Sequence, residues 1–202
     1  MFTVEAVRKT FTGWAPFYDA THAWTLPFRR EARLALGAQR GDRVLEVACG
    51  TGLNFAHLRE LVGDEGQVVG VDLTPAMLER AQRRIARHGW KNVEVREADA
   101  AQLPFPEASF DKAICTFALN IIPNDVRAIE EIRRVLASGG RFVSLEMGAR
   151  VHAVPGWLKP LAGICAVDMS RQTPDELRRG FGAVQVRQYG MGMFFIATAT
   201  KR

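Results

Sequence analysis

Two short segments of the chain combine residue types that could bind a nucleoside. The segment from Val44 to Gly52 reads VLEVACGTG, and Asp72 ends the segment VGVD that begins at Val69. The apolar residues predict a buried parallel strand, and the Gly-x-Gly pair lets the backbone turn sharply and approach a ligand closely. A carboxylate at the end of the following strand could bind ribose hydroxyls. The order of strand, Gly-x-Gly turn, helix, strand and acid therefore predicts a nucleoside site.

The residues around the turn indicate which kind of nucleoside would fit. A dinucleotide site of the G-x-G-x-x-G type has a third glycine and places a pyrophosphate at the helix N-terminus. Phe55 stands at the position of that third glycine, and Glu46 puts negative charge near the place a diphosphate would occupy. Both features favour a ligand with a positive centre and no phosphates. They argue against a nicotinamide-dependent oxidoreductase.

Five motifs, in order along the chain, resemble those of the class I S-adenosylmethionine (SAM) methyltransferases. Glu46 to Gly52 looks like the first motif of that family, and Asp72 matches its ribose-binding acid. The resemblance covers roughly residues 14–147. The other motifs follow at compatible spacings: Val71 to Leu78, Glu97 to Phe105, Phe110 to Cys115, and Leu136 to Phe142.

The resemblance implies a methyltransferase whose cofactor is SAM, with Asp72 on the ribose and Asp99 on the exocyclic amino group of adenine. Structural alternatives remain open for two residues, since Asp99 could cap the loop after the third strand and Met77 could fill a gap in the core. Cys49 is expected to be a small buried hydrophobe rather than a nucleophile. The implied cofactor-binding residues are Tyr18, Glu46, Ala48, Gly50, Gly52, Asp72, Leu73, Met77, Asp99, Ala100 and Thr116.

Methyl transfer from a sulfonium is an in-line displacement that requires alignment and exclusion of water more than a catalytic constellation. A base is needed only for an acceptor that arrives protonated. Tyr18 is the first candidate, because WAPFYD at residues 14–19 resembles a motif in which a tyrosine closes over SAM; alternatively, Tyr18 only packs there. The other candidate bases are His22, Glu146 and His152.

The acceptor is inferred from short motifs. Thr116 to Asn120 is similar to a segment of the ubiquinone/menaquinone C-methyltransferases, which place an arginine where Asn120 stands. The WAPFYD segment looks more like bacterial phosphatidylethanolamine N-methyltransferases, so phosphatidylethanolamine is the expected acceptor. A soluble small molecule or a quinone precursor is the alternative. A catalytically silent SAM-binding scaffold would be expected to have lost Gly50, Gly52 or Asp72, and all three are present.

Composition limits the class of protein. The chain has 202 residues, of which 48% are hydrophobic and 24% charged, as in one globular domain with a substantial core. Residues 1–12 lack the apolar stretch of a secretory signal, and no run is long enough to span a membrane. Cys49, Cys115 and Cys165 are odd in number and widely spaced, which favours free thiols in the cytoplasm. The four histidines lack metal-ligand spacing, so no metal is expected.

The net charge of +5 could suggest a nucleic-acid or membrane partner. No nucleic-acid module is evident, so no nucleic-acid partner is expected. Arg29, Arg30 and Arg33 form the densest basic group, beside the aromatic Trp24 and Phe28. Such a group could face anionic lipids, which predicts peripheral contact with the inner face of the membrane. The alternative is a solvated helix face.

The elements that must position these residues alternate along the chain. Strands are expected at residues 43–48, 67–71, 93–97, 111–116 and 140–147, with helices at 53–62, 75–88 and 125–137. This alternation predicts a Rossmann-like, doubly wound α/β fold with a mostly parallel sheet, closed by an antiparallel hairpin from residues 184–188 and 193–200.

A single domain over residues 1–202 is expected, in three parts. Residues 1–40 hold seven of the eighteen aromatic residues and are predicted to form helices of a lid, interrupted by Pro16 and Pro27. Residues 41–147 form the SAM-binding core, and residues 148–202 form an acceptor-side segment and the closing hairpin. Ligands of such sheets bind outside the carboxyl ends of the strands, where lid and acceptor segment could fold over them.

Overall fold

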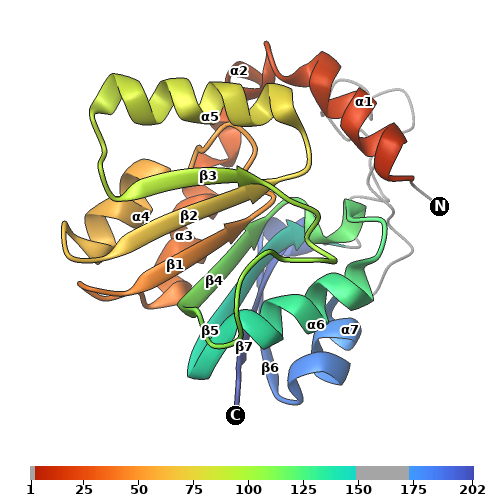
Figure 1. Cartoon of the computed structure of the whole chain (residues 1–202). Coiled ribbons are helices and arrows are strands. Elements are labelled where there is room, and N and C mark those ends of the chain that lie inside the picture. The colour runs from red at the N-terminus through yellow and green to blue at the C-terminus, as the bar shows by residue number, and fades with distance from the viewer. Residues whose placement is uncertain (1–2, 149–172) are drawn as a thin grey trace.

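A computed structural model of the chain describes residues 3–148 and 173–202, and within these residues the strands form one twisted sheet (Figure 1). The strand order is β3-β2-β1-β4-β5-β7-β6. The strands are β1 (Arg43–Val47), β2 (Gln67–Asp72), β3 (Val93–Glu97), β4 (Phe110–Thr116), β5 (Leu136–Met147), β6 (Val184–Tyr189) and β7 (Phe194–Thr200).

The sheet is parallel from β3 to β5 and antiparallel where β7 joins β5 and β6 joins β7. Val47 pairs with Val71 on one side and with Cys115 on the other, so β1, β2 and β4 end at the same edge. The predicted Rossmann-like fold and its closing hairpin are confirmed. The register also brings the Gly-x-Gly turn and Asp72 to one place, as the sequence required.

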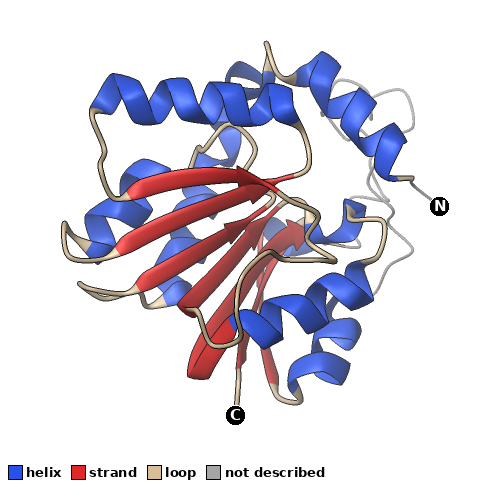
Figure 2. Cartoon of the chain, viewed as in Figure 1, coloured by secondary structure: helices blue, strands red, loops and turns tan. Residues whose placement is uncertain are grey.

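Helices cover both faces of the sheet (Figure 2). The helices α3, α4 and α5 contribute to one apolar cluster, while α6 and α7 contribute to the other. The helices are α1 (Val4–Trp14), α2 (Tyr18–His22), α3 (Leu26–Leu36), α4 (Phe55–Val62), α5 (Pro75–His88), α6 (Asp125–Val135) and α7 (Thr173–Phe181), with short 3-10 turns η1 (Ala23–Thr25), η2 (Leu119–Ile121) and η5 (Gly190–Gly192).

Two helix starts show how local sequence sets the boundaries. Pro75 lies in the first turn of α5 and Gly89 ends this helix in the left-handed conformation, as both residues favour. Pro27 was expected to interrupt the N-terminal helices, but it lies in the first turn of α3. A proline there costs no hydrogen bond, because the first amides of a helix have no partner within it.

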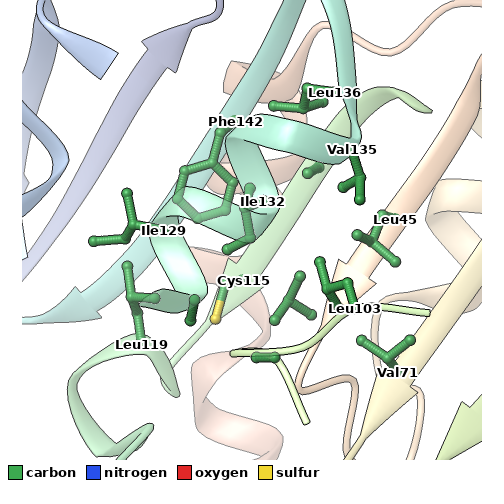
Figure 3. Packing of buried hydrophobic residues seen from close by; sticks show 14 of the residues in the cluster. Leu45, Val71, Leu103, Cys115, Leu119, Ile129, Ile132, Val135, Leu136 and Phe142 are labelled. Carbon is green, nitrogen blue, oxygen red and sulfur yellow. The ribbon is translucent and has the colours of Figure 1, made fainter. Parts of the chain in front are cut away.

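The core on the α6 face is built from aliphatic and aromatic residues of helix and sheet. Ile129 and Ile132 of α6 pack beside Phe142 of β5 in Figure 3, and Cys115 of β4 lies in the same cluster. The thiol of Cys115 is fully buried, and burial raises its pKa well above the ordinary value. It therefore acts as a small hydrophobe.

Phe55 explains why this chain has no third glycine. Its ring is fully buried in the opposite core, beneath the Gly-x-Gly turn. A Cβ added to Gly70 would lie 2.6 Å from Cζ of Phe55 and 2.8 Å from Sγ of Cys49. The ring occupies space that Gly70 and Gly52 leave open, so helix α4 packs on the sheet through a side chain rather than through close backbone contact.

We expect Phe55→Ala to lower the free energy of unfolding by about 3–5 kcal/mol, because it removes a buried ring and leaves a cavity. Urea denaturation followed by circular dichroism measures this change. Leu34→Ala is the control, since Leu34 is 54% exposed and its truncation should cost far less. Equal losses in the two variants would contradict the packing role of Phe55.

Candidate active site

A cavity opens at the carboxyl ends of β1, β2 and β4, beneath α1 and α2. It encloses about 680 Å³ including its open mouth, which is in the range of small-molecule sites. Nine of the eleven predicted cofactor-binding residues line it: Tyr18, Ala48, Gly50, Asp72, Leu73, Met77, Asp99, Ala100 and Thr116. The other two, Glu46 and Gly52, do not line it. Glu46 lies buried behind its wall, and Gly52 faces the ring of Phe55.

Asp72 is held in place by backbone donors. The amides of Gly50 and Thr74 each donate a hydrogen bond to one of its carboxylate oxygens, at 2.8 Å. Burial raises the pKa of Asp72, and these amides act against that shift because they favour the charged form. The carboxylate lines the cavity and is an acceptor, so it can accept hydrogen bonds from neighbouring hydroxyls of a ligand.

Asp99 and Met77 each have a structural role and also line the cavity. Asp99 accepts a hydrogen bond from the amide of Ala101 at 2.9 Å, which is the expected capping role, and it also lines the cavity. Met77 is 1% exposed and belongs to the core, yet it too forms part of the cavity wall.

Burial raises the pKa of Cys49 well above the ordinary value, so this thiol is unsuited to act as a nucleophile.

A buried polar network lies behind the cavity. Asn54 donates to Glu46 at 2.7 Å and to Thr116 at 3.1 Å. Arg33 donates to the Asn54 side-chain oxygen at 2.9 Å, and Arg29 donates to Thr116 Oγ1 at 2.5 Å. Burial raises the pKa of Glu46 to about 7. Asn54, Arg29 and Arg33 were not among the predicted site residues, because no local pattern in the sequence identifies them.

The predicted basic patch is wrong in two of its three residues. Arg29 is 3% exposed and Arg33 is 4% exposed, whereas Arg30 is exposed. Both buried guanidinium groups have internal partners, and that of Arg29 also lies 5.1 Å from the centre of the Phe117 ring. These arginines therefore cannot meet lipid phosphates. Two guanidinium groups beside one carboxylate, Glu46, place positive charge behind the wall of the cavity.

Tyr18 closes the cavity from α2. Its ring stacks on His22 with centroids 3.9 Å apart and contacts the edge of Phe11 at 6.5 Å. Burial raises the pKa of Tyr18, while Arg29 acts in the opposite direction. A phenol with a raised pKa is a poor base at neutral pH, which favours packing and positioning over proton transfer.

A second cavity, of about 570 Å³ with its mouth, adjoins the first and shares walls with it. The shared residues are Phe11, Tyr18, Phe117 and Ile121. The second cavity is lined by Phe11, Trp14, Tyr18, His22, Thr25, Phe117, Asn120, Ile121, Glu146 and Met147. Three of the candidate bases, Tyr18, His22 and Glu146, thus line the second cavity. The fourth, His152, lies outside the described residues. So do residues 149–172, which were expected to form part of the acceptor side.

Helices α1 and α2 are held over the cavity by a few polar contacts. Arg8 forms an ion pair with Glu97 at 2.6 Å, and Asp19 accepts hydrogen bonds from Thr51 at 2.5 Å and from Arg84 at 2.6 Å. No residue of α1 is buried. A helix with these properties can open at low cost in free energy.

The parallel sheet, the Gly-x-Gly turn and the acid at the end of β2 define a Rossmann-like α/β protein with a nucleoside pocket. Residues 44–140 match the family model described as a methyltransferase domain. A demethylmenaquinone methyltransferase of Listeria monocytogenes is 31% identical over 158 residues, which cover 76% of this chain and 66% of that protein. The chain belongs to the class I SAM-dependent methyltransferases, whose cofactor is SAM.

Solved structures share the fold. A SAM-dependent methyltransferase from Aquifex aeolicus has a TM-score of 0.70 at 20% identity and covers 86% of this chain and 89% of its own. The 4+2 cyclase SpnF has a TM-score of 0.80 at 18% identity and covers 98% and 96%. The second likeness shows that proteins of this fold carry out more than one reaction, so the acceptor must be argued from the site.

We expect Asp72→Ala to weaken binding of SAM and S-adenosylhomocysteine by about 1–3 kcal/mol, because hydrogen bonds to a charged group are lost. Isothermal titration calorimetry measures this change. Asp64→Ala, at a residue whose side chain is 82% exposed, is the matched control and should bind as the unaltered protein does. Unchanged affinity in the Asp72 variant would contradict the ribose-binding role.

Amide hydrogen exchange in residues 3–28 should slow when S-adenosylhomocysteine is added, because α1 and α2 cover the cavity with few buried contacts. Mass spectrometry of peptic peptides follows this exchange, with peptides of α6 as the internal control. Equal exchange with and without ligand would mean that this segment is fixed packing rather than a lid.

Proposed function

We propose that this chain transfers a methyl group from SAM to a small aromatic acceptor of the reduced quinone type. The observation that carries the proposal is the pair of adjoining cavities that share Phe11, Tyr18, Phe117 and Ile121. A donor in the first cavity and an acceptor in the second would meet at these shared walls. The name of the Listeria relative, a demethylmenaquinone methyltransferase, supports an acceptor of this class.

The residues of the first cavity suit each part of SAM. The carboxylate of Asp72 can bind the ribose hydroxyls, and Asp99 can accept from the adenine amino group. Gly50 has a φ of 56°, and its lack of a Cβ lets the backbone lie close to the ligand. Thr116 adjoins the network of Arg29, which suits the carboxylate of the methionine end.

SAM supplies an electrophilic methyl group on a positively charged sulfur. The acceptor must therefore supply an electron pair, which an electron-poor quinone ring cannot do and its dihydroxy form can. The apolar walls of the second cavity suit a flat aromatic ring, and Trp14 and Phe117 are among them. Tyr18 and Phe11 cover the junction, where they would hold the ring in line with the methyl group and exclude water.

The phospholipid amine expected from the sequence now takes second place. It was expected from the WAPFYD segment and supported by a basic patch, and two residues of that patch, Arg29 and Arg33, are buried. No helix within residues 3–148 and 173–202 is long and apolar enough to cross a membrane. Across the same residues, no group of three His, Cys, Asp or Glu side chains could hold a metal ion.

Incubation with methyl-labelled SAM tests the proposal. We expect S-adenosylhomocysteine and a labelled product with 2-prenyl-1,4-dihydroxynaphthalene under anaerobic conditions, and neither with the oxidised quinone. Mass spectrometry identifies both products, and Asp72→Ala serves as the control with impaired cofactor binding. Methylation of phosphatidylethanolamine in vesicles, with no methylation of the reduced naphthalene, would contradict the proposal and favour the phospholipid amine as acceptor.

A further inference from the structure

The second cavity contains a buried carboxylate at the end of β5. The side chain of Glu146 is fully buried. Its Oε1 accepts hydrogen bonds from the amide of Leu119 and from the hydroxyl of Ser144, both at 3.0 Å. Its Oε2 is buried and has no hydrogen-bond partner among the described residues. A buried polar atom without a partner is costly, and such atoms often mark a place where a ligand completes the hydrogen bonding.

Asn120 presents a second unpaired acceptor to the same cavity. The residue is 6% exposed, and its Oδ1 has no partner in the part of the chain that the structure describes. His22 adds a third acceptor. Its Nδ1 lies 3.0 Å from the carbonyl oxygen of Tyr18 and 3.0 Å from Oγ1 of Thr21; in the tautomer that donates from Nδ1 to this carbonyl, Nε2 is the acceptor.

The cavity therefore combines apolar walls with hydrogen-bond acceptors. Its walls include Phe11, Trp14 and Met147. The ligand that complements this arrangement has a flat apolar body and groups that donate hydrogen bonds. An aromatic diol satisfies both requirements, whereas a quinone, which only accepts, leaves the unpaired oxygens of Glu146 and Asn120 without a donor.

We propose that Glu146, together with Asn120, binds the hydroxyl of the acceptor and that the Glu146 carboxylate takes the hydroxyl proton. This inference rests on the proposed function. As the O–H bond breaks, its electron pair enters the ring, and a ring carbon forms a bond to the methyl carbon. The C–S bond breaks and its electrons stay on sulfur, which leaves neutral S-adenosylhomocysteine. The ring carbon then releases its proton to water, and Glu146 returns its proton to the oxygen.

The charged and titratable groups on the elements around Glu146 include Tyr18 and His22 of α2, Arg29 and Arg33 of α3 and Cys115 of β4. Glu46 of β1 also acts on Cys115 and has a pKa raised to about 7, so the loss of the pH dependence in Glu146→Gln is what assigns it to Glu146. Burial raises the pKa of Glu146 to about 7, and its contacts with the Leu119 amide and the Ser144 hydroxyl oppose this. Raised pKa values keep Tyr18 and Cys115 neutral near pH 7, and a lowered pKa keeps His22 neutral. The active carboxylate form grows as pH rises, so kcat should rise through about pH 7.

Glu146→Gln tests the inference with the reduced naphthalene acceptor, since the amide keeps the shape and can still accept from Leu119. We expect kcat to fall at least 100-fold and its rise with pH to disappear, while affinity for S-adenosylhomocysteine stays within twofold. Asn120→Ala should raise KM at least fivefold with a smaller effect on kcat. Glu130→Gln, on the exposed face of α6, is the control and should change none of these values.

The outcomes separate this inference from the proposed function. If the unaltered protein forms no S-adenosylhomocysteine with the reduced naphthalene, the proposed function fails and this inference fails with it. If the unaltered protein turns over and Glu146→Gln keeps its kcat and pH profile, the inference alone is overturned. If circular dichroism shows that Glu146→Gln is unfolded, the KM of Asn120→Ala tests the inference instead. An unchanged KM in that variant overturns the binding role shared by Glu146 and Asn120.

Discussion

The hydrogen bond from the Gly50 amide to the Asp72 carboxylate joins the two parts of the cofactor site. It requires β1 and β2 to end side by side, and the parallel register supplies this. It also requires a left-handed turn at Gly50, which a residue with a Cβ adopts only with strain. Phe55 supports the turn from below, because its ring fills the space beneath Gly52 and Gly70. The first cavity, helices α1 and α2 above it and the second cavity beside it all lie at this edge of the sheet.

Two buried glutamates, Glu46 and Glu146, differ in their surroundings and therefore in the role that each can have. Burial raises the pKa of both Glu46 and Glu146 to about 7. Glu46 accepts a hydrogen bond from Asn54 and lies near the charges of Arg29 and Arg33, which act against the rise in its pKa. Its Oε2, like that of Glu146, has no partner among the described residues, but Glu46 lines neither cavity. Glu146 accepts from the amide of Leu119 and the hydroxyl of Ser144, and it lines the second cavity. The carboxylate that lines a cavity is the one suited to exchange a proton with a ligand.

The sequence predicted the sheet, the hairpin and most of the cavity wall because these depend on local patterns. Apolar runs define strands, and Gly50 and Asp72 carry their geometry in their residue types. Arg29 and Arg33 could not be placed in the same way. Their partners Thr116 and Asn54 lie 87 and 21 residues away in sequence, so only tertiary packing determines that they are buried. The membrane contact expected from the sequence loses support for the same reason, since it treated these arginines as exposed.

A crystal structure with S-adenosylhomocysteine and 1,4-dihydroxynaphthalene tests most directly whether the two adjoining cavities hold donor and acceptor. The account predicts the ribose on the carboxylate of Asp72 and the naphthalene ring between Trp14 and Phe117. It also predicts one hydroxyl of the ring within hydrogen-bond distance of Glu146. A nucleoside bound away from Asp72, or an aromatic ring bound outside the second cavity while the first is filled, would contradict it.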